Sequence, residues 1–224
     1  MFKLYIGIIL PVTIVFPLLM AAGAYRWLLP PEKIAAFYLL ADGIANIIAV
    51  SLAKNGINNM PVFHIYPVAE FLLLTLFFKR SLAGTLVDRY AWLFIGGFTI
   101  FAIADAFFIQ GFLHFNTYPR TLEAFLLLFF ALFFFYKRID AAVIEKWDEN
   151  PSVWFTIALF LYFSGALVLF LLSGQLTRNS RANDLAWTIH ASLQLLLYML
   201  FTVGFYRCRQ RKAGGASIQQ PYAK

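Results

Sequence analysis

The sequence predicts an all-α membrane protein that folds as a seven-transmembrane-helix bundle. Of its 224 residues, 62% are hydrophobic and 13% are charged, whereas soluble domains carry roughly 45–50% apolar and about 25% charged residues. The chain also contains seven long apolar stretches, each close to the ~20 residues that a helix needs to cross a bilayer. This composition excludes an ordinary soluble globule, a disordered chain and a disulfide scaffold.

The seven predicted spans are mostly uncharged and do not alternate every second residue, which favours helices over the strands of an outer-membrane barrel. Their ranges are 4–25, 34–53, 61–78, 90–111, 118–136, 153–173 and 185–206. Prolines indicate where several of these helices begin or bend. Pro30 and Pro31 open the second helix, Pro61 starts the third, Pro151 precedes the sixth, and Pro11 and Pro17 are expected to kink the first.

Basic residues near the span ends predict the orientation of the bundle, because cytoplasmic connections are enriched in Lys and Arg. Thirteen of the 18 Lys and Arg residues belong to one set of connections. The N-terminus is therefore expected outside and the C-terminus in the cytoplasm, with one domain over residues 1–212 and a flexible cytoplasmic tail over 213–224. The formal net charge of +7 reflects this asymmetry and not a nucleic-acid partner. A signal peptide cleaved after residues 22–24 is the rival interpretation, but it would place the basic set outside.

Two parts of the sequence resemble each other, which raises the alternative of a bundle built from repeated helical hairpins. Residues 63–80 and 117–138 share a Tyr-Pro pair, a Glu, a run rich in aliphatic residues and Phe, and a basic ending. Each follows a span that carries an Ala-Asp pair, at Asp42 and at Asp105. Duplicated hairpins occur in transporter folds, but shared membrane composition also produces such similarity by chance.

Charged side chains are costly inside a bilayer, about 2.5–3.5 kcal/mol each at the helix centre, so those present indicate candidate functional positions. Four acids and two histidines fall within the predicted spans: Asp42, Glu70, Asp105, Glu123, His64 and His190. Counted from the span ends, all of these except Asp42 and Glu70 lie about 8 Å below the outer surface. Glu70 lies deeper, and Tyr38, Asp42 and Asn46 share one face of the second span because they are spaced four residues apart.

These positions predict a polar pocket that opens toward the outside and narrows inward. Its expected lining is His64, Tyr66, Glu70, Asp105, Tyr118, Glu123 and His190, and the predicted ligand- or proton-binding set is His64, Tyr66, Glu70, Asp105, Glu123, His190, Asp42 and Asn46. Histidines mixed with carboxylates suit a proton-responsive site or a divalent metal, for which His64 and His190 would be the nitrogen ligands. Two plainer alternatives stay open. The acids would only join helices by hydrogen bonds, or Arg120 would pair with Glu123 near the surface and make that glutamate structural.

No cofactor and no catalytic residue is predicted. A seven-helix chain with an outside N-terminus resembles the microbial rhodopsins, but the last span, 185–206, has no lysine to bind retinal. The helix count also resembles the ceramidase-like intramembrane hydrolases, which use a zinc ion held by several histidines. The paired histidines of their last helix are missing here, so enzyme activity is less expected than binding.

The third span begins with the stretch Asn58-Asn59-Met60-Pro61-Val62-Phe63-His64-Ile65-Tyr66, followed by Glu70-Phe71. This stretch resembles one in an uncharacterised family of bacterial seven-helix integral membrane proteins. The resemblance implies a multi-pass protein of the plasma membrane (the bacterial inner membrane) that works near signalling kinases. It also implies that His64, Tyr66 and Glu70 are family-defining positions.

Three function classes follow from these observations. A receptor-like sensor would bind a small or lipophilic ligand in the outer pocket and signal to a cytoplasmic partner through loop 137–152 or the tail. A proton-coupled transporter of small solutes would use Glu70 and Asp42 as a carboxylate relay. An intramembrane lipid-modifying hydrolase would need His64 and His190 to meet an acid around a metal or a water. The short outer loops leave no external ligand domain, so the sensor, with its ligand inside the bundle, is the first expectation.

Overall fold

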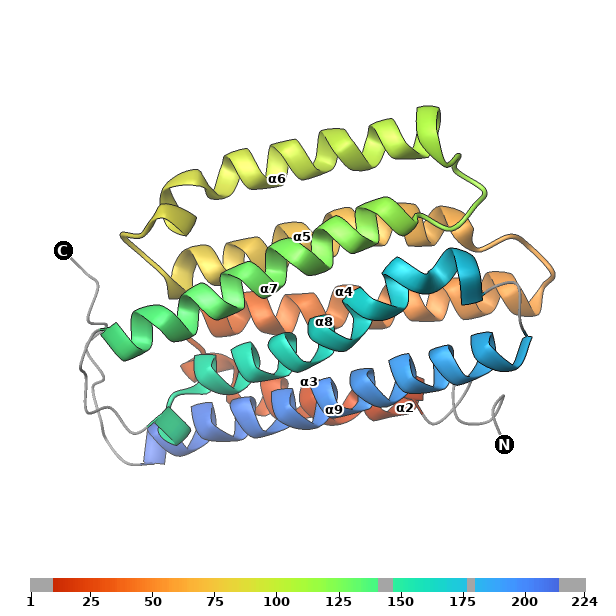
Figure 1. Ribbon diagram of the computed structural model, residues 1–224. Coiled ribbons are helices and arrows are strands. Elements are labelled where there is room, and N and C mark those ends of the chain that lie inside the picture. The colour runs from red at the N-terminus through yellow and green to blue at the C-terminus, as the bar shows by residue number, and fades with distance from the viewer. Residues whose placement is uncertain (1–9, 141–146, 177–179, 214–224) are drawn as a thin grey trace.

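The structure is a computed structural model that describes residues 10–140, 147–176 and 180–213 (Figure 1). The described elements are helices, which confirms the all-α prediction. In chain order they are α2 (Leu10–Thr13), α3 (Val15–Ala24), η2 (Tyr25–Trp27), α4 (Pro30–Lys54), α5 (Met60–Ser81), α6 (Leu86–Ala104), the π-helical turn η3 (Asp105–Ile109), α7 (Thr117–Asp140), η4 (Trp147–Glu149), α8 (Pro151–Leu176) and α9 (Ser180–Ala213).

The long helices lie side by side along one axis, and consecutive helices run in opposite directions (Figure 1). Along the bundle α4 packs on α5, α7 on α8, α8 on α9, and α3 on α9. Helix α6 lies at one edge, where it packs on α5 and touches α7 only lightly. We call the end with the α5–α6 connection and the last turn of α7 the basic end, because Lys79, Arg80, Lys137 and Arg138 lie there. The other end, with the α4–α5 and α6–α7 connections, is the opposite end.

Six described helical segments are long and apolar enough to cross a membrane: Leu10–Trp27, Pro30–Lys54, Met60–Ser81, Leu86–Ile109, Pro151–Ser173 and Arg181–Arg211. Large hydrophobic side chains also point outward from the bundle, such as Leu93, Ile100 and Phe108, which are 71%, 71% and 86% exposed. Exposed apolar surface on this scale is unfavourable in water and suits contact with lipid. These features indicate a multi-pass membrane protein. Helix α7 is a further long helix of the bundle, in addition to these six segments.

Local chemistry explains where two of the predicted helix features occur. Helix α4 begins at Pro30, and the Glu32 carboxylate accepts the N–H of Leu29 at 2.7 Å, so one of the free N–H groups of the helix start has a partner. The first helix is interrupted at Ile14, between α2 and α3. The interruption lies one turn before Pro17, where a kink is expected, because Pro17 has no N–H and its ring crowds the carbonyl of the residue four positions earlier.

The predicted partner loop, 137–152, is largely helical where the structure describes it. Helix α7 continues to Asp140, and η4 and α8 follow directly from Trp147. Arg207 of α9 lies 3.3 Å from a carboxylate oxygen of Asp148, so η4 is tied to the end of α9. Residues 141–146 of this loop lie outside the described residues, and so do residues 214–224 of the predicted tail.

Helices α8 and α9 approach closely at Gly204, which yields a stability prediction. A Cβ atom added at Gly204 would lie 2.4 Å from Cε1 of Phe155, a fully buried ring that also packs on Phe201 and Phe205. Because overpacking of this kind typically costs about 1–3 kcal/mol, Gly204→Ala is expected to lower the free energy of unfolding by that amount in detergent micelles. Gly97→Ala in α6 is the control, since its Cβ would meet no described atom within 4 Å. Equal stability of the two variants would contradict the close packing of α8 on α9.

Candidate functional site

Arg120 of α7 connects two buried carboxylates from different helices. Its Nη1 donates to Oε2 of Glu70 on α5 at 2.6 Å and to Oε2 of Glu123, one turn further along α7, at 3.1 Å. The guanidinium carbon lies 5.4 Å from the ring centroid of Tyr66 and 5.6 Å from that of Phe170. Both acids are almost fully buried, at 1% and 0% exposure. Arginine is thus held by two ion pairs and two aromatic rings.

The ion-paired cluster continues through Tyr66 to Asp42. The Tyr66 hydroxyl lies 3.1 Å from Oε1 of Glu70 and 3.1 Å from Oδ1 of Asp42 on α4. On the other side of Asp42, Oδ2 accepts a hydrogen bond from the Tyr198 hydroxyl on α9 at 2.5 Å. A continuous line of contacts therefore joins α7, α5, α4 and α9. We call it the buried polar chain, made up of Glu123, Arg120, Glu70, Tyr66, Asp42 and Tyr198.

Two amides complete the surroundings of Asp42. Asn46 Nδ2, one turn along α4, donates to Oδ1 at 3.0 Å, and Gln194 Nε2 on α9 donates to Oδ2 at 3.3 Å and to the Tyr198 hydroxyl at 2.8 Å. With the two tyrosine hydroxyls, four hydrogen-bonding groups surround the two oxygens of Asp42. Such saturation is what a buried carboxyl group requires in an apolar interior.

The Tyr66 hydroxyl restricts how protons are distributed along the buried polar chain. A phenol has one hydrogen, so it donates to either Asp42 or Glu70 but not to both. The second contact is a hydrogen bond only when that carboxyl group is itself protonated and donates to the phenol oxygen. Both contacts of the Tyr66 hydroxyl are therefore hydrogen bonds when either Asp42 or Glu70 is protonated and the other is ionised. At the Glu123 end of the buried polar chain, Oε1 of that residue is buried with no hydrogen-bond partner among the described residues.

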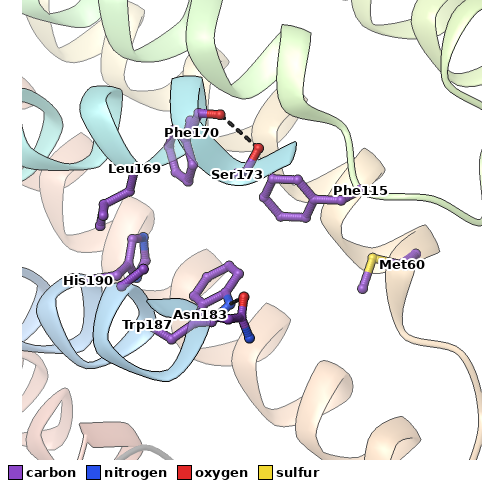
Figure 2. Close-up of a pocket in the computed structure, with 9 residues that line it drawn as sticks. Met60, Phe115, Leu169, Phe170, Ser173, Asn183, Trp187 and His190 are labelled. Carbon is purple, nitrogen blue, oxygen red and sulfur yellow. Dashed lines mark hydrogen bonds between the residues drawn. The ribbon is translucent and has the colours of Figure 1, made fainter. Parts of the chain in front are cut away.

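A cavity of about 240 Å³ lies beside the buried polar chain, near the opposite end of the bundle. Figure 2 shows Leu169, Phe170 and Ser173 of α8 facing Asn183, Trp187 and His190 of α9 across it, with Phe115 and Met60 to one side. The cavity walls are mainly apolar and aromatic. Its lining residues are Met60, Phe115, Leu169, Phe170, Ser173, Asn183, Ala186, Trp187 and His190.

Two lining residues of this cavity also contact charged or polar members of the interior. The ring of Phe170 packs on the Arg120 guanidinium, and Nε2 of His190 lies 3.1 Å from the hydroxyl of Tyr162 on α8. The cavity and the buried polar chain are therefore adjacent, because Phe170 lines the cavity and its ring contacts Arg120.

His64 and Asp105 lie apart from the buried polar chain. Nε2 of His64 contacts the carbonyl oxygen of His114 at 2.9 Å, in the connection between α6 and α7. Asp105 opens the π-helical turn η3 and is fully buried, and neither of its carboxylate oxygens has a hydrogen-bond partner among the described residues. In the part of the chain that the structure describes, no hydrogen bond joins either residue to Asp42 or Glu70.

The structure thus divides the predicted pocket instead of forming it as one polar cavity. Asp42, Asn46, Tyr66, Glu70 and Glu123 come together in the buried polar chain or directly against it. His190 lines the apolar cavity, His64 contacts the α6–α7 connection at the opposite end, and Asp105 begins the turn η3. The placement of Tyr118 in the pocket lining is wrong, because this side chain is 54% exposed.

Sequence reasoning missed the central position of Arg120 and the contribution of Tyr198 on α9. A pair between Arg120 and Glu123 was one of the open alternatives, and the Arg120 side chain reaches both Glu123 and Glu70 on the neighbouring helix. Gln194 and Tyr198 are four residues apart and face Asp42 together. Their spacing on an apolar span was the one signal that could have pointed to them.

Among the described residues, no group of three or more His, Cys, Asp or Glu side chains is placed to hold a metal ion. His64 and His190, the candidate ligands, take part in separate sets of contacts.

Comparisons with protein-family models, with curated proteins and with solved structures found no match to the chain.

Proposed function

We propose that the protein crosses the membrane seven times, with its N-terminus outside and its basic end in the cytoplasm. The 24-residue helix α7 runs antiparallel to α6 and α8, the long helices that precede and follow it in the chain, and it lies along the same axis as the six apolar segments (Figure 1). The alternating directions bring the basic ends of three helices to one end of the bundle, and cytoplasmic ends carry such an excess of basic residues. These residues include Lys79, Arg80, Lys137, Arg138, Arg207, Arg209 and Arg211.

We further propose that the protein is a receptor-like sensor of a small, mainly apolar ligand. One observation carries this proposal, the aromatic-lined cavity of about 240 Å³ that shares Phe170 with the ion-paired Arg120. Ligand pockets are concave, mostly apolar and furnished with a few polar groups. This volume is below the usual range of about 300–1,000 Å³, so the ligand is a small molecule of one or two rings or a short aliphatic chain.

Ligand binding changes the buried polar chain through Phe170, which lines the cavity and contacts Arg120. A molecule in the cavity presses on Phe170, whose ring lies against the Arg120 guanidinium, and on His190, which contacts Tyr162. A shift of Arg120 alters its ion pair with Glu70 and hence the contacts of Tyr66 and Asp42. Because Asp42 joins α4 to α5 and α9, the change reaches helices that extend to the basic end. A ligand that prefers one arrangement of these helices shifts their equilibrium toward it.

The sensor proposal is tested by thermal unfolding of the purified protein with indole and naphthalene as neutral probes. A probe that binds only the folded protein stabilises it, by about 2.7 kcal/mol at a concentration of 100 times Kd. Ala186 lines the cavity, so Ala186→Trp is expected to fill it and to abolish stabilisation by the probe. Leu185→Trp is the matched control on the same helix, since Leu185 is 61% exposed and outside the lining. Stabilisation that persists in Ala186→Trp, or that neither probe produces in the native chain, contradicts the proposal.

A second candidate, a proton-coupled transporter of small solutes, is favoured by the contacts around Tyr66. The hydroxyl lies 3.1 Å from both Asp42 and Glu70, so a proton can pass between two carboxyl groups with little movement of heavy atoms. In proteoliposomes under a pH gradient, a transporter would show proton flux that Glu70→Gln abolishes. Flux with this behaviour would favour the transporter over the sensor, and ligand stabilisation without flux would favour the sensor.

A further inference from the structure

His190 of α9 lies where the apolar cavity meets the interior of the bundle. It is one of the residues that line the cavity, and Figure 2 shows its ring on the α9 side, opposite Leu169. Its ring centroid lies 5.5 Å from that of Tyr162, 5.9 Å from that of Phe170 and 5.6 Å from that of Trp187. Three aromatic neighbours therefore hold the imidazole, and packing of this kind fixes the directions of its two nitrogens.

The contact with Tyr162 determines which nitrogen of His190 carries the hydrogen. Nε2 lies 3.1 Å from the Tyr162 hydroxyl, and this tyrosine is 6% exposed, with no other hydrogen-bond partner for its hydroxyl among the described residues. A buried hydroxyl hydrogen requires an acceptor, and Nε2 accepts it only when that nitrogen has no hydrogen of its own. The neutral ring then carries its hydrogen on Nδ1. His190 is thus a donor through Nδ1.

The Nδ1–H of His190 has no acceptor in the part of the chain that the structure describes. The other polar side chains of the cavity lining are already engaged. The Ser173 hydroxyl donates to a backbone carbonyl of α8 at 2.8 Å and contacts the Thr117 hydroxyl at 3.0 Å. Oδ1 of Asn183 accepts the Trp187 indole N–H at 3.1 Å, so the part of this amide that remains is its NH₂ group. The polar groups that the lining leaves for a ligand are therefore donors.

We propose that this cavity binds a small, neutral aromatic carbonyl compound, whose oxygen accepts the Nδ1–H of His190. The inference rests on the sensor function proposed above, since it names the ligand class of the same cavity. The aromatic ring of such a ligand packs against Phe115, Phe170 and Trp187, which line the same space (Figure 2). Aromatic rings gain contact area and favourable ring geometry from such walls.

Other ligand classes fit this lining less well. A carboxylate would enter without a partner, because with His190 neutral the described lining has no cation, and burying an unpaired charge is costly. An alcohol or a phenol also accepts from Nδ1, but its own hydrogen would then need an acceptor that the polar side chains of the lining do not offer. A hydrocarbon leaves the Nδ1–H unsatisfied. A carbonyl oxygen accepts a hydrogen bond and brings no further donor into the cavity.

The test compares 1-indanone with indane, which has the same two rings but no carbonyl group. Binding of each compound to the purified full chain is measured by thermal unfolding, for the native protein and for His190→Leu. The preference for 1-indanone over indane is expected to fall about fivefold in His190→Leu, the value of one neutral hydrogen bond. Leu169→Ala, in the opposite wall, is the control, since it removes apolar contact from both compounds and should leave their ratio unchanged.

A second measurement uses the native chain alone. The infrared C=O band of bound 1-indanone is expected at a lower frequency than in hexane, because a hydrogen bond weakens the C=O bond. A band at the hexane position, or an unchanged preference in His190→Leu, would overturn the inference and leave the cavity as a ligand site. The inference also fails alone if neither compound binds while indole or naphthalene does. If none of the four binds, the sensor proposal fails with it.

Discussion

Arg120→Gln is expected to lower the free energy of unfolding by about 3–5 kcal/mol, the range measured when one partner of a buried ion pair is removed. The variant leaves Glu70 and Glu123 in the bundle without the guanidinium that contacts both, and the two acids are 1% and 0% exposed. It also removes the planar group that lies on the rings of Tyr66 and Phe170. The measurement is reversible unfolding of the purified protein in mixed micelles, followed by circular dichroism.

The control separates unpaired charge from lost packing. The triple variant Arg120→Gln, Glu70→Gln, Glu123→Gln has no buried charge at these three positions, and glutamine is close in shape to glutamate. It is expected to recover more than half of the lost stability, because removing all members of a buried ionic cluster is far less damaging than removing one. If the triple variant is as unstable as the single one, the ion pairs are not the reason why Arg120 matters.

The positions of the helices could be predicted because the thickness of a bilayer fixes the length of a membrane-spanning helix. A span needs about 20 apolar residues, and prolines and charges mark its ends, so the range 34–53 corresponds closely to Pro30–Lys54 and 61–78 to Met60–Ser81. The range 90–111 is correct in position, but its last part forms the π-helical turn that begins at Asp105. No pattern in the sequence predicted that turn, because its wider hydrogen-bonding spacing depends on the path of the backbone from α6 into the α6–α7 connection.

The candidate site was less predictable, because sequence gives the depth of a residue in a span but not the direction in which it points. Counting residues placed His64, Asp105, Glu123 and His190 at a similar depth. The two histidines and Glu123 take part in three different sets of contacts, and the Asp105 carboxylate has no hydrogen-bond partner among the described residues. Tyr66 and Tyr118 occupy equivalent places in the two similar sequence stretches. Tyr66 is 9% exposed and inside the bundle, whereas Tyr118 is 54% exposed. The rotation of each helix follows from packing with its neighbours, which the composition of one span does not contain.

Side-chain length also matters to the difference between the predicted and the observed site. Glu70 was expected to lie deeper in the membrane than Glu123. Arg120 bridges that difference in depth, because its long side chain places one nitrogen within 3.1 Å of Glu123 and within 2.6 Å of Glu70. A basic residue near a span end is normally expected to extend toward the interface. Here the buried carboxylates and two aromatic rings hold it inside the bundle.

Asp42→Leu is expected to lower the free energy of unfolding by at least about 3 kcal/mol. The Tyr198 hydroxyl is left without its acceptor, which costs about 1–3 kcal/mol, and the hydrogen bonds that Asn46 and Gln194 donate to this carboxyl group, each worth about 0.5–1.5 kcal/mol, are lost as well. The loss would fall on the packing of α4 against α5 and α9, so hydrogen exchange should increase in those helices before it does in α6. Asp42→Asn keeps the shape and one acceptor oxygen, and is expected to lose less than half as much. Leucine is more favourable than aspartate in an apolar interior, and a native-like stability of Asp42→Leu would show that Tyr66 and Tyr198 find other partners. In that case Asp42 would not be the residue that joins the buried polar chain to α9.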